Sequence, residues 1–144
     1  MLVKELVLAK PTFCLVDDYL QQTAQIMADN DLMCVPVVES LAHKNVIGVI
    51  TDKEICRGVV AAGLKPSNTS VGRVMNSRFF TVDLDTDTEN CSRIMKENKI
   101  SFLFVIDENN SCTGIITEDD IAETDFSENF QSHSFQYIRH DRIF

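Results

Sequence analysis

The chain has 144 residues and a mass of 16.2 kDa, which fits one compact domain or two small halves that share a core. Its formal net charge of −9 argues against duplex DNA or an anionic membrane as the main partner, since both require a basic surface. The N-terminus has no apolar core of signal-peptide length, and no apolar run reaches the ~18 residues of a membrane helix. We therefore expect a cytoplasmic protein with no nucleic acid or membrane as partner.

The cysteines are scattered singly along the chain. Their odd number and the absence of a C-x-x-C pair fit neither a disulfide framework nor a zinc site. We expect small buried thiols in a reducing compartment, and no metal site. The positions are Cys14, Cys34, Cys56, Cys91 and Cys112.

The first half of the chain predicts a strand, a helix, two strands and a second helix. Pro36 interrupts the second strand and suggests an edge strand or an irregularity. Gly63 and the proline after it end the last helix. The expected order is an entry helix over 3–7, a strand over 12–16, a helix capped by 17–18 and stopped by 30–31, a strand over 32–38, a strand over 46–50 and a helix up to 63.

The second half predicts the same order of elements. Asp87 caps its long helix, whose buried face carries Cys91, Ile94 and Met95. Sliding the first half by 68 residues aligns the two copies, and the offset falls to 66 after a longer first loop. The expected order is a short helix over 71–75, a strand over 79–83, the capped helix, a strand over 101–106, a turn over 107–110 and a strand over 112–116.

Two corners, at 48–55 and 114–121, are the closest internal match. In each, an apolar strand breaks at a threonine, Thr51 or Thr117, and acidic residues follow. Such a corner gathers backbone N–H groups, hydroxyls and carboxylates around one small cleft. The alternative is structural, because a threonine followed by acids also makes a good helix N-cap.

The repeat predicts an α+β fold made of two units, each strand-helix-strand-strand-helix, related by pseudo-twofold symmetry. One unit cannot cover its own three-stranded sheet, so the two should pack sheet against sheet or helix face against helix face. Ligand clefts would then occur in related pairs between the units. We predict a first unit over 1–66, a second over 67–123 and an aromatic tail over 124–144.

This pattern resembles a tandem pair of cystathionine beta-synthase (CBS) domains, the Bateman module. The resemblance covers residues 1 to about 123. It is strong at 71–75, at 100–107 and in both corners, and the run 51–66 looks like small stand-alone prokaryotic CBS pairs.

The resemblance implies a binding module for an adenosine-containing small molecule such as AMP, ADP, ATP, NAD or S-adenosylmethionine, acting as a regulatory ligand rather than a cofactor. By position it casts Asp120 and Glu54 as ribose ligands, with Thr117 and Thr51 near the phosphate. Glu54 stands where the family more often has Asp, so we expect the Asp120 cleft to be the occupied one.

The resemblance also implies an apolar adenine pocket and a basic group for the phosphate. Phe104 replaces the proline that Pro36 supplies in the first copy, so the two pockets should differ in shape. Of the arginines, Arg78 is favoured, with Arg57 and Arg73 as further phosphate candidates. The predicted pocket residues are Thr12, Cys34, Pro36, Val49, Ile50, Thr81, Phe102, Leu103, Ile115 and Ile116.

No constellation calls for catalysis, and we expect that the protein is not an enzyme. The run 83–87 resembles a calcium loop but lacks its glycine and closing glutamate. Neither His43 nor the tail histidines have a serine or cysteine partner that the sequence places beside them.

The tail over 124–144 carries several aromatic residues, which we expect to pack on the body, on a dimer mate or on a partner. The family resemblance favours a homodimer. Two hypotheses follow. The first is a sensor that signals ligand binding to a separate regulated protein, and the second is a non-binding dimerisation or interaction scaffold with vestigial clefts.

Overall fold

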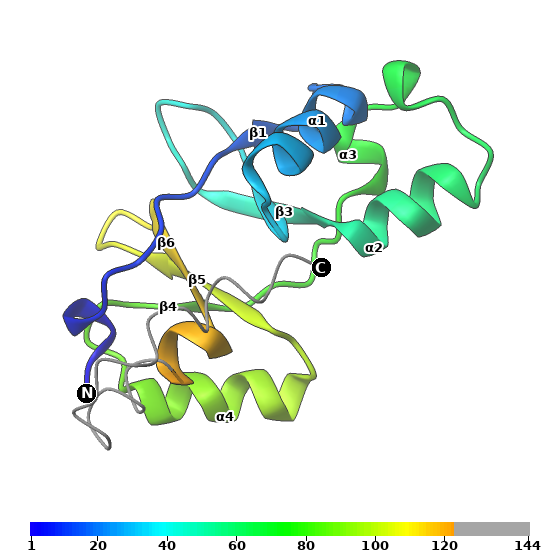
Figure 1. Ribbon diagram of the computed structural model, residues 1–144. Helices are drawn as coiled ribbons and strands as arrows, with labels where there is room; N and C mark the ends of the chain where they lie inside the picture. Colours follow the sequence, from blue (N-terminus) through cyan, green and yellow to red (C-terminus); the bar gives the residue numbers. More distant parts are fainter. Residues whose placement is uncertain (123–144) are drawn as a thin grey trace.

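The structure of the protein, a computed structural model, describes residues 1–122. The long helices and the strands of the two halves alternate as the sequence predicts (Figure 1). The first half contains η1 (Val3–Glu5), β1 (Cys14–Leu15), α1 (Leu20–Asn30), β2 (Cys34–Val38), β3 (Val46–Thr51), α2 (Asp52–Ile55) and the π-helical turn η2 (Cys56–Val60). The second contains η3 (Pro66–Asn68), α3 (Val71–Val74), β4 (Thr81–Val82), α4 (Thr88–Asn98), β5 (Phe102–Ile106) and β6 (Cys112–Thr117), followed by helical residues at 118–122.

The two halves form two three-stranded sheets with the same topology, β1-β2-β3 and β4-β5-β6. In each sheet the first pair of strands is parallel and the second pair is antiparallel. The register also repeats, since Cys34 pairs with Thr51 and Phe102 pairs with Thr117. These features confirm the predicted repeat and the α+β fold class.

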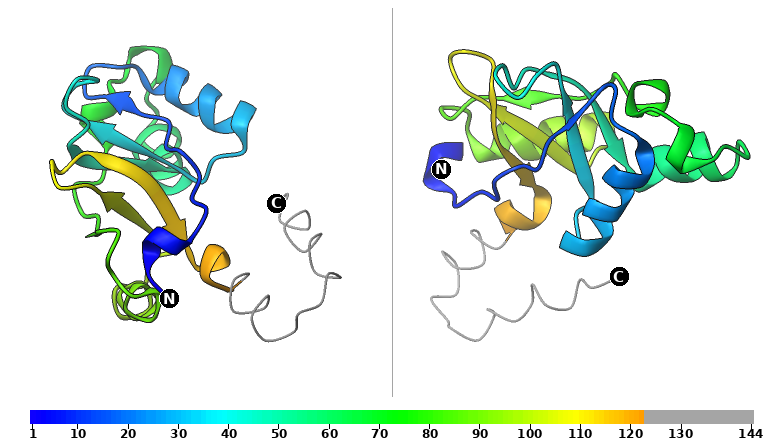
Figure 2. Two further views of the ribbon diagram at one scale, coloured as in Figure 1. Left: turned by 90° about the vertical axis from the view of Figure 1, so that its left-hand side faces the viewer. Right: turned by 90° about the horizontal axis from the view of Figure 1, so that it is seen from above.

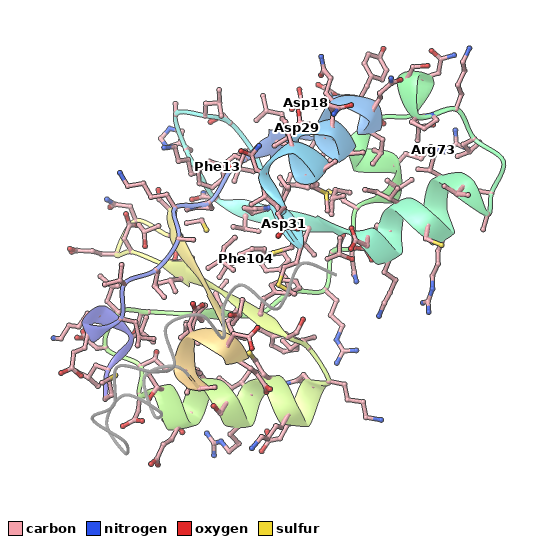
Figure 3. The ribbon with its side chains drawn as sticks, viewed as in Figure 1. Phe13, Asp18, Asp29, Asp31, Arg73 and Phe104 are labelled. Atoms are coloured by element: carbon pink, nitrogen blue, oxygen red, sulfur yellow. The ribbon has the colours of Figure 1, made fainter. Side chains whose placement is uncertain are left out.

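The sheets face each other, and the helices lie on the outside of both (Figure 1). One buried cluster per half joins each sheet to its helices, and a third contains side chains of both sheets but of no helix. Phe104 belongs to this third cluster, is 0 % exposed and lies between the halves (Figure 3). The halves therefore pack sheet against sheet, which was one of the two predicted arrangements.

The N-cap of the long helix follows the sequence in one half only. The Asp87 carboxylate accepts the Glu89 N–H at 2.8 Å and caps α4, as predicted. In the first half the N-cap is Tyr19, so the predicted cap by 17–18 is wrong. Asp18 instead accepts the Leu15 N–H at 2.8 Å and closes the turn after β1.

Pro36 lies in β2, the central strand of its sheet, so the predicted edge position is wrong. Its carbonyl accepts the Cys14 thiol at 3.8 Å and therefore faces the short strand β1. Because the nitrogen and the carbonyl of one strand residue point to the same side, the nitrogen of Pro36 faces β1 as well. Pairing with β1 begins only at Val37, so the missing N–H removes no ladder hydrogen bond. The predicted irregularity is confirmed by a register shift between Val37 and Val38.

Each half is completed by the segment that precedes the other half. The Val3 N–H donates to the Thr86 carbonyl at 2.9 Å, and Val3 is 0 % exposed in the core of the second half. In the first half, the Val71 N–H donates to the Asp18 carbonyl at 2.7 Å. Figure 2 shows the N-terminal segment beside α4 before the chain crosses to the first sheet. We call residues 1–9 and 69–76 the two straps.

The buried N-terminal strap yields a testable prediction. Val3→Ala should lower the free energy of unfolding by about 2 kcal/mol, because it removes fully buried apolar surface. Amide exchange should rise in β4, β5 and α4 more than in β1, β2 and α1. Val7→Ala is the matched control, since Val7 is 95 % exposed and its truncation should change stability little. Equal losses from the two variants would contradict the docking of the strap.

Four cysteines are buried and Cys56 is exposed. The predicted burial is therefore confirmed for four thiols and is wrong for Cys56, which lies at the start of η2. Burial raises the pKa of Cys14 and of Cys34 from 9.0 to about 12, because a thiolate would lose its hydration there. Burial likewise raises the pKa of Cys112 to about 11.

These pKa shifts predict both reactivity and pH dependence. At pH 8 a disulfide reagent should modify Cys56 in the folded protein and the other thiols only after unfolding. As pH rises above about 9, the thiols of the unfolded chain ionise first, so the free energy of unfolding should fall toward pH 12. Urea titrations at pH 8 and 10 measure this fall, which should be smaller in Cys34→Ala. Modification of all thiols at the rate of Cys56 would contradict the burial.

Candidate functional site

The first corner is a closed hydrogen-bonded ring at the start of α2. The N–H and the hydroxyl of Thr51 donate to Glu54 Oε1 at 2.8 and 2.6 Å. The Lys53 N–H donates to Thr51 Oγ1 at 3.2 Å. Strand β3 therefore ends in a capping box that starts the helix, as the structural alternative requires.

The second corner has the same arrangement with a shorter acid. The N–H and the hydroxyl of Thr117 donate to Asp120 Oδ2 at 2.8 and 3.0 Å, and the Asp120 N–H returns to Thr117 Oγ1 at 3.4 Å. The structure thus brings together both predicted threonine and carboxylate pairs. The additional methylene of Glu54 does not change the type of hydrogen bonding.

A strap passes close to each corner strand. Val49 bridges to Asn76, and Ile115 bridges to Ala9. The strap packs tightly on Gly48, since a Cβ there would lie 2.6 Å from the Met75 sulfur and 3.2 Å from the Asn76 carbonyl oxygen. The segments 8–9 and 75–76 were not predicted to belong to the site, although the glycine of each corner is a signal for a closely packed neighbour.

Strand alternation divides the predicted pocket residues into two groups. Cys34, Val49, Phe102 and Ile115 belong to the cluster between the sheets. The second group is fully buried against the helices of its own half, so these side chains are not placed to line a cleft between the sheets. It consists of Ile50, Leu103 and Ile116.

The walls of the two corners differ in exposure. At the first corner, Cys34 is 3 % exposed and Val49 is 2 % exposed. Their counterparts at the second corner are Phe102 and Ile115, and both remain partly exposed. An apolar surface is therefore accessible beside Thr117 and Asp120 but is closed beside Thr51 and Glu54.

The remaining predicted residues differ in burial, and Pro36 pairs with Val49 of the first-corner wall. Pro36 is buried, whereas Thr12 and Thr81 are exposed. The Arg78 guanidinium stacks on the Phe80 ring at 5.7 Å from its centroid, and Arg57 is exposed on the helix that follows the first corner.

Other kinds of site receive no support from the described part of the chain. Within residues 1–122 no three or more histidine, cysteine or acidic side chains converge as metal ligands would. Over the same range, no helix combines the length and apolar character needed to span a membrane. The histidines and aromatic residues predicted for the tail lie outside the described residues.

Several curated proteins are similar to this chain. Uncharacterized protein MJ0450 of Methanocaldococcus jannaschii is 29 % identical over 118 residues, or 82 % of this chain and 63 % of that protein. Homoserine O-acetyltransferase of Methanosalsum zhilinae is 35 % identical over 73 % of this chain, but the match spans 20 % of the enzyme. Hypoxic response protein 1 of Mycobacterium tuberculosis is 29 % identical over 72 % of this chain and 70 % of its own length. The chain thus spans less than two thirds of the first two relatives.

Solved structures have the same fold. The CBS domain pair of protein MJ0100, in complex with 5′-methylthioadenosine and S-adenosyl-L-methionine, matches with a TM-score of 0.77 at 22 % identity, over 90 % of this chain and 98 % of that chain. Hypoxic Response Protein I with two coordinated zinc ions matches with a TM-score of 0.73 at 24 % identity, over 85 % and 98 %.

The family model of the CBS domain matches the chain twice, at residues 3–61 and 71–126. These matches coincide with the two halves that the sheets, helices and corners define. The chain therefore belongs to the CBS domain family and contains a tandem pair of these domains.

Proposed function

We propose that this chain is a regulatory module that binds an adenosine-containing nucleotide at the corner formed by Thr117 and Asp120. One observation carries the proposal: the half-buried carboxylate of Asp120 lies on the corner whose apolar wall, Phe102 and Ile115, remains accessible. The matching wall of the first corner, Cys34 and Val49, is sealed.

The chemistry of this corner suits a nucleoside. A carboxylate has about four lone-pair positions, so Asp120 can hold its Thr117 contacts and also accept hydrogen bonds from a ribose diol. Phe102 and Ile115 offer an apolar surface on which a base can pack. Arg78 and Arg57 are the predicted cations for a phosphate group, and their roles stay predictions.

The choice of ligand class draws on the MJ0100 domain pair, which binds two adenosine derivatives. For this chain we include AMP, ADP, ATP, NAD and S-adenosylmethionine, all of which share the adenosine portion. The proposed regulatory role is supported by two enzymes of which only a small part matches this chain. The match spans 20 % of the homoserine O-acetyltransferase and 23 % of inosine-5′-monophosphate dehydrogenase of Streptococcus pyogenes, so the shared part is a minor share of each enzyme.

The proposal extends to how the module acts. We place it in the cytoplasm as a homodimer without enzymatic activity of its own, signalling to a separate protein. A ligand at the second corner lies beside the strap 1–9, which packs on the second half and leads into the first half, so binding can shift the balance between two arrangements of the halves.

A second function is favoured by a specific observation. Both corner carboxylates already serve as partners in capping boxes, and the first corner is closed. A dimerisation or interaction scaffold with vestigial clefts needs only this structural use of the corners.

Calorimetric titration with the five ligands separates the two functions. We expect saturable binding of at least one ligand, and a ligand at a hundred times its Kd should also stabilise the fold by about 2.7 kcal/mol. Asp120→Ala should abolish binding, because the ribose loses its charged acceptor.

Glu54→Ala is the matched control, since it removes the same kind of capping contact from the other corner and should leave binding unchanged. Binding is measured by direct titration and not by ligand-induced stabilisation, because loss of a helix cap alone lowers the free energy of unfolding by about 1 kcal/mol. Absence of binding by all five ligands would favour the scaffold, and binding that survives Asp120→Ala would refute the ribose assignment.

A further inference from the structure

A cavity of about 330 Å³ opens on the second half, away from its corner. It is bordered by β4, α4 and Ile106, the last residue of β5. Ile106 pairs with Cys112 at the start of β6, whereas the corner lies at the other end of that strand, where Phe102 pairs with Thr117. The volume is at the lower end of the ~300–1,000 Å³ range of small-molecule sites.

Two opposite charges border this cavity without pairing with each other. Asp83 and Arg93 both line it, yet the one ion pair found within residues 1–122 joins Lys4 and Asp85. A molecule that carries both a negative and a positive group can therefore bind between them. Both side chains are exposed, and a molecule with a single charge would pair with only one of them.

Short hydrogen bonds hold both charged side chains in position. Asp83 Oδ1 accepts the Asp85 N–H at 2.9 Å and the Thr86 hydroxyl at 3.0 Å. Arg93 Nη2 donates to Asn90 Oδ1 at 3.0 Å. Because a guanidinium has five N–H donors and a carboxylate about four acceptor positions, each group keeps capacity for a ligand.

The remaining lining includes an apolar surface. Val82 is buried, and Ile94 and Ile106 are partly exposed. These three side chains come from β4, α4 and β5 and supply the apolar part of the lining. An aliphatic group of a ligand would lose exposed surface against them.

The first half does not repeat these features. At the offset of 68 residues, Leu15 occupies the position equivalent to Asp83, and Gln25 occupies the position equivalent to Arg93. Phe13 likewise stands for Thr81, which lines the cavity. The first half therefore lacks the pair of opposite charges at these positions, so the pair is a property of the second half and not of the fold.

We propose that this cavity binds a free α-amino acid with an aliphatic side chain, for which leucine is the probe. The carboxylate of the amino acid receives paired hydrogen bonds from the Arg93 guanidinium. Its ammonium group donates to Asp83, and its side chain packs on Val82, Ile94 and Ile106. The site is separate from the nucleotide corner, so this proposal does not depend on the proposed function.

Amide chemical shifts of the full chain report this binding residue by residue. L-leucine should produce saturable shifts concentrated at 81–83 and 90–94. Two analogues with the same side chain test the two charges: 4-methylpentanoate lacks the ammonium group, and 3-methylbutylamine lacks the carboxylate. Each should bind at least tenfold more weakly than leucine. Equal affinity for all three, or shifts that do not saturate, would overturn the proposal.

Matched variants locate the site. Arg93→Gln introduces the residue that the first half carries, and Asp83→Asn removes the charge while it keeps an acceptor for Thr86. Each should weaken leucine binding at least tenfold. Arg73→Gln is the control, because Arg73 is exposed on α3, which packs against the core of the first half and does not border the cavity (Figure 3). Unchanged affinity in Arg93→Gln would refute the assignment. Asp120→Ala should leave leucine binding intact, which separates this result from the nucleotide test.

Discussion

The fold depends on the mutual burial of two small sheets. Helices cover one face of each three-stranded sheet, and the other face has no cover within its own half. Phe104, Cys34, Val49 and Cys112 close this gap from both sides, in a cluster without helix residues. A single half would expose this apolar face to water, so the two copies are stable only together. The crossed straps reinforce this dependence, since each half receives part of its packing from the segment that leads into the other.

The same constraint places the corners. Strands β3 and β6 must end where the chain leaves the sheet, and a threonine with an acid three residues later starts the helix there through a capping box. The structural and the functional interpretation of the corner motif are therefore compatible. The carboxylate that caps the helix at the second corner accepts the N–H of Thr117, which pairs with Phe102 of the apolar wall. What distinguishes the corners is their surroundings, because the backbone and the hydrogen bonds are nearly the same in both.

The two halves share a framework but differ in what they leave open. At the corner, the first half closes the surface with Cys34 and Val49, and at the positions equivalent to Thr81 and Asp83 it carries Phe13 and Leu15. In the second half, Phe102 and Ile115 remain partly exposed, and Asp83 and Arg93 border an open space. Both proposed sites therefore lie in the second half. Duplication of a fold allows such a division, in which one copy mainly supports the structure and the other carries binding surfaces.

The sequence by itself determined the repeat, the order of elements, the α+β class and the pairing of each threonine with its acid, because these depend on local signals: apolar periodicity, capping residues and turn residues within a few positions. Tertiary structure decided the rest. Pro36 occupies a central strand because β1 is too short to need its N–H, and Tyr19 rather than an aspartate precedes α1 because Asp18 closes a turn. Which pocket residues face the other sheet, and which corner remains open, depend on strand alternation combined with packing between segments far apart in the chain. No local pattern carries that information, since the accessibility of Phe102 depends on side chains from the opposite half.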